Sequence, residues 1–387
     1  MYQFILILGV LLCFSVPLHS EQKNIYIDAD FNTYVKSSIS IEMGIKTALA
    51  HKGSKINVIR LDHKANSRRS LKNIQKAVQD PNMIAVFSGM HSPPILANKK
   101  FINENKVLFL VPWAAAGPIT RSDSKENWIF RLSVDDSKAG AFLVQEVNEN
   151  KLKKPFLLLE KTGWGQTNHK NITAALREKN LTMAGTEFFN WNPTETNVKI
   201  IVRKILNSGA DSIIFVGNSN EGTTFAKALH SGSVKVPIIS HWGITGGDFF
   251  KNVGPKILEN QHWCFVQTQF SFLSPSLTDY QNDTLKLAVK SFPEHIKNGY
   301  IDSPTGFIHA HDLTLILLEA IKQAGSHDKE KIHASLESLQ NPVQGLIKSY
   351  TKPFSKYSKE NPDAHEALGS KDLSIGIFDS KGRVKLK

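Results

Sequence analysis

A serine and two prolines follow a short apolar run that ends at residue 88. Ser92 precedes Pro93 and Pro94. Serine is a common N-cap residue and proline is favoured at the first helical position, so we expect a helix to begin here with Ser92 as its N-cap. The hydroxyl and the free N–H groups at such a helix end suit a carboxylate or a similar anion. The alternative, that Ser92 only caps its own helix, fits the spacing equally well.

Three of the six tryptophans lie just after apolar runs. Trp113 precedes the small residues Ala114 and Ala116, which would let a ligand approach the backbone. Trp164 lies between two glycines, and Trp242 precedes another glycine. Any one tryptophan could belong to a core, but three in equivalent positions indicate an aromatic cleft. Such a cleft suits an apolar, aromatic or quaternary-ammonium ligand.

Polar residues follow a further apolar run that ends at residue 217. Asn218 and Glu221 are the candidates for ligand contact in this stretch. Glu221 is equally well explained as a residue of the first helical turn, where the helix dipole favours a carboxylate.

Patterns typical of catalysis or metal binding are weak. His309 and His311 are two residues apart, so they would not share a helix face. His365-Glu366 lacks the second histidine of a zinc-protease motif, because Gly369 stands four residues after His365. The sequence contains no nucleophile elbow and no phosphate-binding loop. We therefore expect no enzyme, no metal site and no cofactor.

The elements that position these residues alternate along the chain. Apolar runs predict strands at 24–28, 56–61, 84–88, 107–111, 156–160, 212–217 and 237–240. Periodic stretches between them predict helices at 38–51, 70–79, 93–105, 138–150, 168–179, 198–208 and 221–230. This order predicts an α/β protein with doubly wound parallel sheets. Such sheets bind ligands at the carboxyl ends of their strands, where all the candidate residues fall.

The N-terminal residues favour export. Residues 4–16 are almost entirely apolar and are followed by Pro17 and a short polar stretch that ends at Ser20. We expect a signal peptide over 1–20 and a periplasmic location; the alternative is a buried N-terminal strand or helix. Cys13 would then be removed, and Cys264 would be left as a buried apolar thiol.

The remaining composition describes a large, basic protein. The 387 residues are too many for a single core and suit two domains. The net charge is +12, but the Lys and Arg residues are spread along the chain. We therefore interpret the charge as a solvated surface that anionic membrane surfaces would attract, and expect no nucleic-acid partner.

The order and spacing of several motifs together resemble the branched-chain amino-acid-binding (Leu/Ile/Val-binding-like) family of type I periplasmic binding proteins, the extracytoplasmic receptors of ABC importers. The motifs are the stretch 62–70, Phe87-Ser88-Gly89 with Ser92, Val111-Pro112-Trp113, Gly163-Trp164-Gly165-Gln166, His241-Trp242-Gly243, Ala310-His311-Asp312 and the tail 353–368.

The resemblance implies two Rossmann-like lobes that close on a ligand by hinge motion. Three crossings would join the lobes, near residues 134–138, 265–269 and 341–345. The first lobe would then hold residues 21–136 and 267–342, and the second lobe residues 137–266 and 343–387.

The resemblance also implies roles for individual residues. Ser92 and the backbone from Ala114 to Ala116 would bind a ligand carboxylate, and Trp164 would cover the ligand from the second lobe. This chain has Trp242 where the amino-acid binders use an acidic residue for the ammonium group. Glu221 or Asp248 could supply that charge instead, and the face of an indole also attracts a cation.

Together these features predict a monomeric solute-binding protein that passes its ligand to the permease of an ABC importer. The ligand would be amino-acid-like, an amide, a quaternary amine or an aromatic acid. Two alternatives are a soluble sensor that reports to a membrane kinase or chemoreceptor, and an enzyme of unknown type on the same fold.

Overall fold

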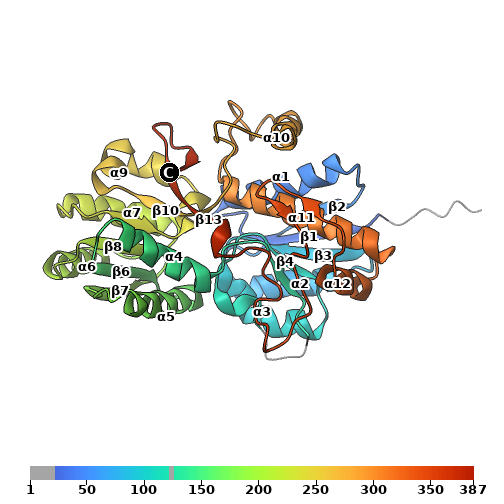
Figure 1. Cartoon of the computed structure of the whole chain (residues 1–387), viewed down its shortest axis with the longest axis horizontal. Helices are drawn as coiled ribbons and strands as arrows, with labels where there is room; N and C mark the ends of the chain where they lie inside the picture. Colours follow the sequence, from blue (N-terminus) through green and yellow to red (C-terminus); the bar gives the residue numbers. More distant parts are fainter. Residues whose placement is uncertain (1–21, 122–125) are drawn as a thin grey trace, which may run out of the picture.

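The structure is a computed structural model that describes residues 22–121 and 126–387. These residues form two α/β lobes, each built around one sheet (Figure 1). The expected signal peptide, residues 1–20, lies outside the described residues. Within the described ranges, no helix combines the length and the apolar character needed to cross a membrane.

The sheet of the first lobe has five parallel strands. Their spatial order is β2 (Asn57–Asp62), β1 (Asn24–Ala29), β3 (Met83–Ser88), β4 (Phe109–Val111) and β5 (Ile129–Arg131). All the carboxyl ends therefore meet at one edge of the sheet, which faces the second lobe (Figure 1).

Helices cover both faces of this sheet. Figure 1 shows α1 (Val35–His51) and α11 (Pro304–Ala324) on one face and α2 (Ser67–Val78) and α3 (Ser92–Glu104) on the other. The lobe is completed by α10 (Asp279–Ser291), α12 (Lys329–Glu337), the short helix η1 (Gly117–Ile119) and the hairpin of β11 (Val343–Gln344) and β12 (Ser349–Tyr350). Fifteen of the 21 residues of α11 are buried, because α1 packs along it.

The sheet of the second lobe has seven strands. The parallel strands are β7 (Gly185–Phe189), β6 (Pro155–Glu160), β8 (Ser212–Val216), β9 (Ile238–Ser240) and β10 (Cys264–Thr268). Two antiparallel strands, β13 (Leu373–Phe378) and β14 (Val384–Leu386), extend the sheet beyond β10.

Alternate residues of these strands supply two cores. Leu157 and Leu159 face the core shared with α4 (Asp136–Glu149) and α5 (Gly163–Glu178), whereas Phe156 and Leu158 face a separate core. That second core lies under the helices of the opposite face: α6 (Glu195–Asn207), α7 (Ser219–Ser231), α8 (Phe249–Val253) and α9 (Pro255–Gln261). The predicted α/β fold of two doubly wound lobes is confirmed.

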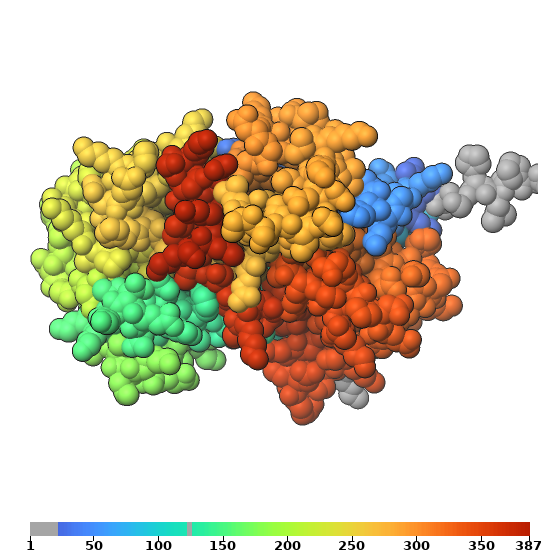
Figure 2. Space-filling model, turned by 45° about the horizontal axis from the view of Figure 1, so that its top comes forward, coloured from blue at the N-terminus to red at the C-terminus, as the bar shows by residue number. Residues whose placement is uncertain are grey.

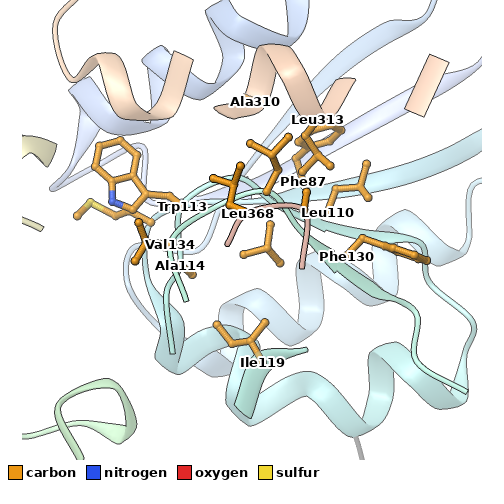
Figure 3. Close-up of a cluster of buried hydrophobic side chains, with 14 of the residues drawn as sticks. Phe87, Leu110, Trp113, Ala114, Ile119, Phe130, Val134, Ala310, Leu313 and Leu368 are labelled. Atoms are coloured by element: carbon orange, nitrogen blue, oxygen red, sulfur yellow. The ribbon is translucent and has the colours of Figure 1, made fainter. Parts of the chain in front are cut away.

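The C-terminal segment returns to the first lobe before it reaches the second. The Asp312 carboxylate of α11 accepts hydrogen bonds from the backbone N–H of Leu346 and from the Tyr350 hydroxyl, at 2.7 Å and 2.8 Å. Leu368 lies in the core of the first lobe beside Phe87 and Leu110 (Figure 3).

These contacts disagree with an assignment of residues 343–368 to the second lobe and with a crossing near residues 341–345. We propose instead that the third crossing follows Leu368, at the short helix η3 (Ser370–Asp372) that leads into β13. Figure 2 shows the red end of the chain between the yellow part of the second lobe and the orange part of the first.

Candidate functional site

Ser92 lies just after the carboxyl end of β3, as expected. Its hydroxyl, however, does not bond to the N-terminus of its own helix. His91 occupies the N-cap position of α3, and Ser92 is the first helical residue. The Ser92 Oγ accepts a hydrogen bond from the backbone N–H of Ala116 at 3.2 Å. The prediction that Ser92 caps its own helix is therefore wrong. Pro93 and Pro94 lack N–H groups, so fewer backbone donors are free at this helix end than the sequence analysis expected.

A buried arginine holds the loop that contains Ala114 and Ala116. The Arg131 Nη1 donates to the carbonyl oxygens of these two residues at 3.3 Å and 2.9 Å. Its other nitrogens donate to the Glu366 carboxylate at 2.6–3.1 Å, and Asp135 lies 3.0 Å away. All three side chains are buried, and the ion pairs fix this loop at the first crossing between the lobes.

Trp113 and Trp242 meet between the lobes. Trp113 follows β4 in the first lobe, and Trp242 begins the short helix η2 (Trp242–Gly246) in the second. Their ring centroids are 6.3 Å apart with an edge-to-face geometry. Figure 3 shows Trp113 at the edge of the core of the first lobe. Among the described residues its buried Nε1 has no hydrogen-bond partner, which leaves a donor available at the lobe interface.

Trp164 lies in the first turn of α5 and not in a loop, and its ring reaches Gly243, the residue after Trp242. The Thr162 hydroxyl caps the helix by accepting from the backbone N–H of Gly165. A Cβ atom at Gly165 would lie only 1.7 Å from the Glu160 carbonyl oxygen, so this position requires glycine. The Trp164 indole packs edge-to-face on His241 at 5.0 Å, and its Nε1 lies 3.2 Å from the Asp136 carboxylate.

Glu221 faces the first lobe from the N-terminus of α7. Its Oε2 accepts a hydrogen bond from the Tyr34 hydroxyl of the first lobe at 3.2 Å, and its Oε1 accepts from the backbone N–H of Asn192 at 3.1 Å. Both side chains of the Tyr34–Glu221 pair are buried. Asp248, by contrast, lies at the rim of the interface in an ion pair with Lys36.

Asn218 contacts a second buried carboxylate of the second lobe, that of Glu160. Its Nδ2 donates to the Glu160 Oε2 at 2.9 Å, and the Thr162 hydroxyl donates to the Glu160 Oε1 at 2.9 Å. Burial raises the pKa of Glu160 to about 7, and the negative charge of Glu221 acts in the same direction. Glu160 therefore titrates near neutral pH in this environment.

The sequence analysis did not select several residues of this interface. Tyr34 packs edge-to-face on His91 at 4.9 Å, and His91 lies 5.3 Å from Trp191 of the second lobe. The Asp30 carboxylate lies 3.6 Å from the His91 Nε2. Asp30 and His91 follow the ends of the predicted strands β1 and β3, so the rule that selected the tryptophans would have found them too. Trp191 follows β7, which was not among the predicted strands.

An open groove leads to this part of the interface. Its volume is about 430 Å³, and it is lined by the N-termini of α2 and α3 together with Thr162 and Trp191 of the second lobe. A ligand could therefore approach the Tyr34–His91–Trp191 cluster without crossing either core.

Two further expectations concern Cys264 and the pair His309 and His311. Cys264 is a buried free thiol, as predicted, and burial raises its pKa to about 12. His309 and His311 contact different partners: the ring nitrogens of His309 lie 2.9 Å from the Pro112 carbonyl oxygen and 3.1 Å from the Thr268 hydroxyl, whereas His311 contacts Asp312.

Two α/β lobes with three crossings and a polar, aromatic interface at their strand ends define a binding protein of the two-lobed, hinged class. The sequence matches the family model described as "Periplasmic binding protein" over residues 34–357. The chain belongs to this family, and the predicted resemblance to type I periplasmic binding proteins is confirmed. No curated protein matches the sequence.

Solved structures share the fold at low sequence identity. A type 1 periplasmic binding protein from Bordetella pertussis is 17% identical, with a TM-score of 0.81 over 95% of this chain and 100% of that chain. The branched-chain amino acid binding protein LivJ from Streptococcus pneumoniae, in complex with isoleucine, is 16% identical with a TM-score of 0.76 (94% and 98%). An ABC-transporter solute-binding protein from R. palustris, in complex with 4-hydroxybenzoate, is 16% identical with a TM-score of 0.77 (95% and 96%).

Proposed function

We propose that this protein captures a small, amino-acid-like zwitterion between its lobes and delivers it to an ABC importer. The observation that carries this proposal is the group of three buried carboxylates at the interface, Asp30, Glu160 and Glu221. Within the described ranges, no Lys or Arg side chain forms an ion pair with any of them. Asp30 has only the His91 imidazole beside it, at 3.6 Å, and Glu160 and Glu221 have no Lys or Arg partner among the described residues. Buried carboxylates without a Lys or Arg partner favour a ligand that supplies a positive group.

The aromatic side chains around these carboxylates suit the same ligand group. The rings of Tyr34 and Trp191 both pack on His91, and the Tyr34 hydroxyl donates a hydrogen bond to Glu221. Aromatic faces attract ammonium and quaternary-ammonium groups, and nearby carboxylates strengthen that preference. We therefore assign the ammonium-binding part of the site to Glu221 and not to the exposed, paired Asp248.

The ligand carboxylate would bind to Ser92 and the loop of Ala114 and Ala116. A carboxylate there would accept hydrogen bonds from the Ser92 hydroxyl and the Ala116 N–H group, which now contact each other at 3.2 Å. Trp113, Trp164 and Trp242 would enclose the apolar part of the ligand, and the unpaired Trp113 Nε1 would donate a hydrogen bond to a polar atom of the ligand. Asn218 would hold Glu160 in place beside Glu221.

The structural relatives support the transport role. The proteins of similar fold from S. pneumoniae and R. palustris are described as transporter solute-binding proteins, and their bound isoleucine and 4-hydroxybenzoate both carry a carboxylate. For this chain we infer a periplasmic monomer whose closed form binds the membrane permease.

A thermal-shift screen would test the proposal. The panel contains amino acids, their amides, quaternary amines and aromatic acids, each with the purified protein lacking residues 1–20. A ligand at about a hundred times its Kd should stabilise the protein by about 2.7 kcal/mol. We expect zwitterions to stabilise it more than their amides or aromatic acids. Stabilisation by aromatic acids alone would contradict the ammonium-binding assignment.

The variant Ser92→Ala then tests the carboxylate assignment. Loss of one charge-assisted hydrogen bond should weaken zwitterion binding by about 1.5–3 kcal/mol, roughly tenfold to a hundredfold. Binding of a quaternary amine without a carboxylate should change little. An equal loss for both ligands in isothermal titration calorimetry would show that Ser92 acts only on the fold.

A further inference from the structure

Two imidazoles and a carboxylate converge on the first lobe, far from the cleft. His333 and Glu337 lie one turn apart on α12, and His365 comes from the C-terminal segment that packs beside this helix. One possible ligand atom from each side chain lies within 4.8 Å of the other two. Figure 1 shows α12 at the end of the first lobe that is remote from the second. The cluster is therefore independent of the binding cleft.

Backbone carbonyl groups fix the protonation of both rings. The His365 Nδ1 lies 3.0 Å from the carbonyl oxygen of Ile129, and the His333 Nε2 lies 2.8 Å from that of Asn127. A carbonyl oxygen only accepts hydrogen bonds, so these two ring nitrogens must carry the protons. In the neutral imidazoles, the lone pairs are then on the His365 Nε2 and the His333 Nδ1.

Both lone pairs face the same carboxylate. The His365 Nε2 lies 3.1 Å from the Glu337 Oε1, and the His333 Nδ1 lies 3.9 Å from the Glu337 Oε2. Neutral imidazole nitrogens and carboxylate oxygens are both acceptors, so this arrangement is favourable only if a cation lies between them. The cation is either a proton on each ring or one shared metal ion.

The surroundings orient the three ligand groups as in known metal sites. Metal-binding histidines commonly donate their second ring N–H to a backbone carbonyl, as both do here. The backbone N–H of Tyr357 donates to the Glu337 Oε1 at 3.1 Å, and the His365 ring stacks on Phe130 with centroids 3.8 Å apart. The rings and the carboxylate therefore have little freedom to turn away.

The cluster is open to solvent on one side. A cavity of about 240 Å³ has His333 and Glu337 on its wall, together with Trp128 and Tyr357. Lys106 also lines it, but its ammonium group is paired with Glu330 at 2.8 Å. The cavity provides an entry path and room for a water molecule as a fourth ligand.

We propose that His333, Glu337 and His365 bind one divalent transition-metal ion, with Zn²⁺ as the best match to two imidazoles and a carboxylate. Zinc bonds of about 2.0–2.2 Å place tetrahedral ligand atoms roughly 3.3 Å apart. The His365 Nε2 is already 3.1 Å from the Glu337 Oε1, and the His333 Nδ1, 3.9 Å from the Glu337 Oε2, has to move closer on binding. The ion joins α12 to the C-terminal segment and keeps one coordination position open to the cavity.

Zinc titration of the untagged, EDTA-treated protein tests this site directly. We expect isothermal titration calorimetry to give one Zn²⁺ per chain, with or without a ligand in the cleft. The variants His333→Gln and Glu337→Gln should each weaken zinc binding by about tenfold to a hundredfold or more. The control is His327→Gln, which removes an exposed histidine that precedes the same helix.

A spectroscopic readout separates metal binding from effects on folding. Co²⁺ in place of Zn²⁺ should give the visible absorption of a tetrahedral ion in the wild type and in His327→Gln, but not in Glu337→Gln. Each variant must keep the circular-dichroism spectrum and the melting temperature of the metal-free wild type. Failure of the wild type to bind stoichiometric Zn²⁺, or equal affinity in Glu337→Gln and His327→Gln, would overturn the proposal and leave protons as the shared cations.

Discussion

At the scale of single residues, Glu221 and Asp248 are two carboxylates of the second lobe with different surroundings. The Glu221 side chain is buried against Tyr34, whereas that of Asp248 is 41% exposed and is paired with Lys36. A buried charge interacts more strongly with a ligand than an exposed and screened one. The two residues therefore form a matched pair for testing which carboxylate contacts the ligand ammonium group.

We predict that Glu221→Gln weakens binding of a zwitterionic ligand by about tenfold to a hundredfold, because a charged hydrogen-bond partner is worth about 1.5–3 kcal/mol. Asp248→Asn should change the affinity less than about fivefold, as expected for a surface charge. Isothermal titration calorimetry at one salt concentration measures both. A larger loss in Asp248→Asn than in Glu221→Gln would show that the ammonium group lies at the rim.

We predict that Glu160 makes ligand binding depend on pH. Its pKa is about 7 because burial and Glu221 disfavour its charged form. A cationic ligand group favours the carboxylate and lowers this pKa, so binding releases a proton. The affinity should therefore be highest above pH 7 and fall about tenfold between pH 8 and pH 6. The variant Glu160→Gln should remove this dependence, and a wild-type affinity that is constant over this range would contradict the assignment.

At the scale of elements, most strands and helices of the first 240 residues could be predicted from the sequence, because each of these combines an apolar run with a clear boundary; the strands β5 and β7 were not predicted. The strand predicted at 156–160 is β6 (Pro155–Glu160), for example. The short strand β5 (Ile129–Arg131) could not be predicted, because it ends on a charged residue. Arg131 is compatible with a buried strand because Asp135 and Glu366 neutralise it, and Glu366 lies 235 positions away.

The candidate ligand and metal sites likewise depend on residues that are distant in the sequence. Strand ends pointed to Ser92, Trp113 and Trp242, because neighbouring strand ends always meet in this fold. The His333–Glu337 spacing also places both side chains on one helix face. Their convergence with His365 depends on the path of the C-terminal segment, which no local pattern specifies. The resemblance assigned that segment to the second lobe, and the ion pair of Arg131 with Glu366 shows why it packs on the first.

That ion pair gives a prediction for the stability of the first crossing. Glu366→Gln leaves Arg131 buried with only Asp135 as a charged partner, at 3.0 Å. Removing one partner of a buried pair costs about 3–5 kcal/mol, and we expect the lower end of this range. Urea denaturation measures the loss, with Asp283→Asn as the control because its pair with Lys286 is exposed. A loss below about 1 kcal/mol, as expected for the control, would contradict a supporting role for this pair.

At the scale of the whole molecule, the two lobes are in contact at several separate points. The aromatic pair Trp113–Trp242 lies inside the interface, and the ion pair of Lys36 with Asp248 lies at its rim. Between them, Gly246 of the second lobe approaches Met90 of the first. In the hinged class, ligand affinity depends on how easily the lobes reach this closed arrangement.

Gly246 is the position at which closure can be tested without changing a ligand-binding side chain. A Cβ atom there would lie 2.7 Å from the Met90 Cε and 3.7 Å from the Trp113 Cζ2. The end of Met90 can move, so Gly246→Ala should have a small effect. Gly246→Val adds two further methyl groups that the interface has to accommodate at a cost of about 1–3 kcal/mol. The affinity for any cleft ligand should fall about fivefold to a hundredfold.

Small-angle X-ray scattering separates closure from folding in this variant. With saturating ligand, the wild type should show a smaller radius of gyration than Gly246→Val, whereas the ligand-free proteins should not differ. The midpoint of urea denaturation without ligand should also change little, because the added methyl groups face Met90 and Trp113 of the other lobe. If Gly246→Val binds ligand as tightly as the wild type, the closed arrangement of Met90, Trp113 and Gly246 is not the one that holds the ligand.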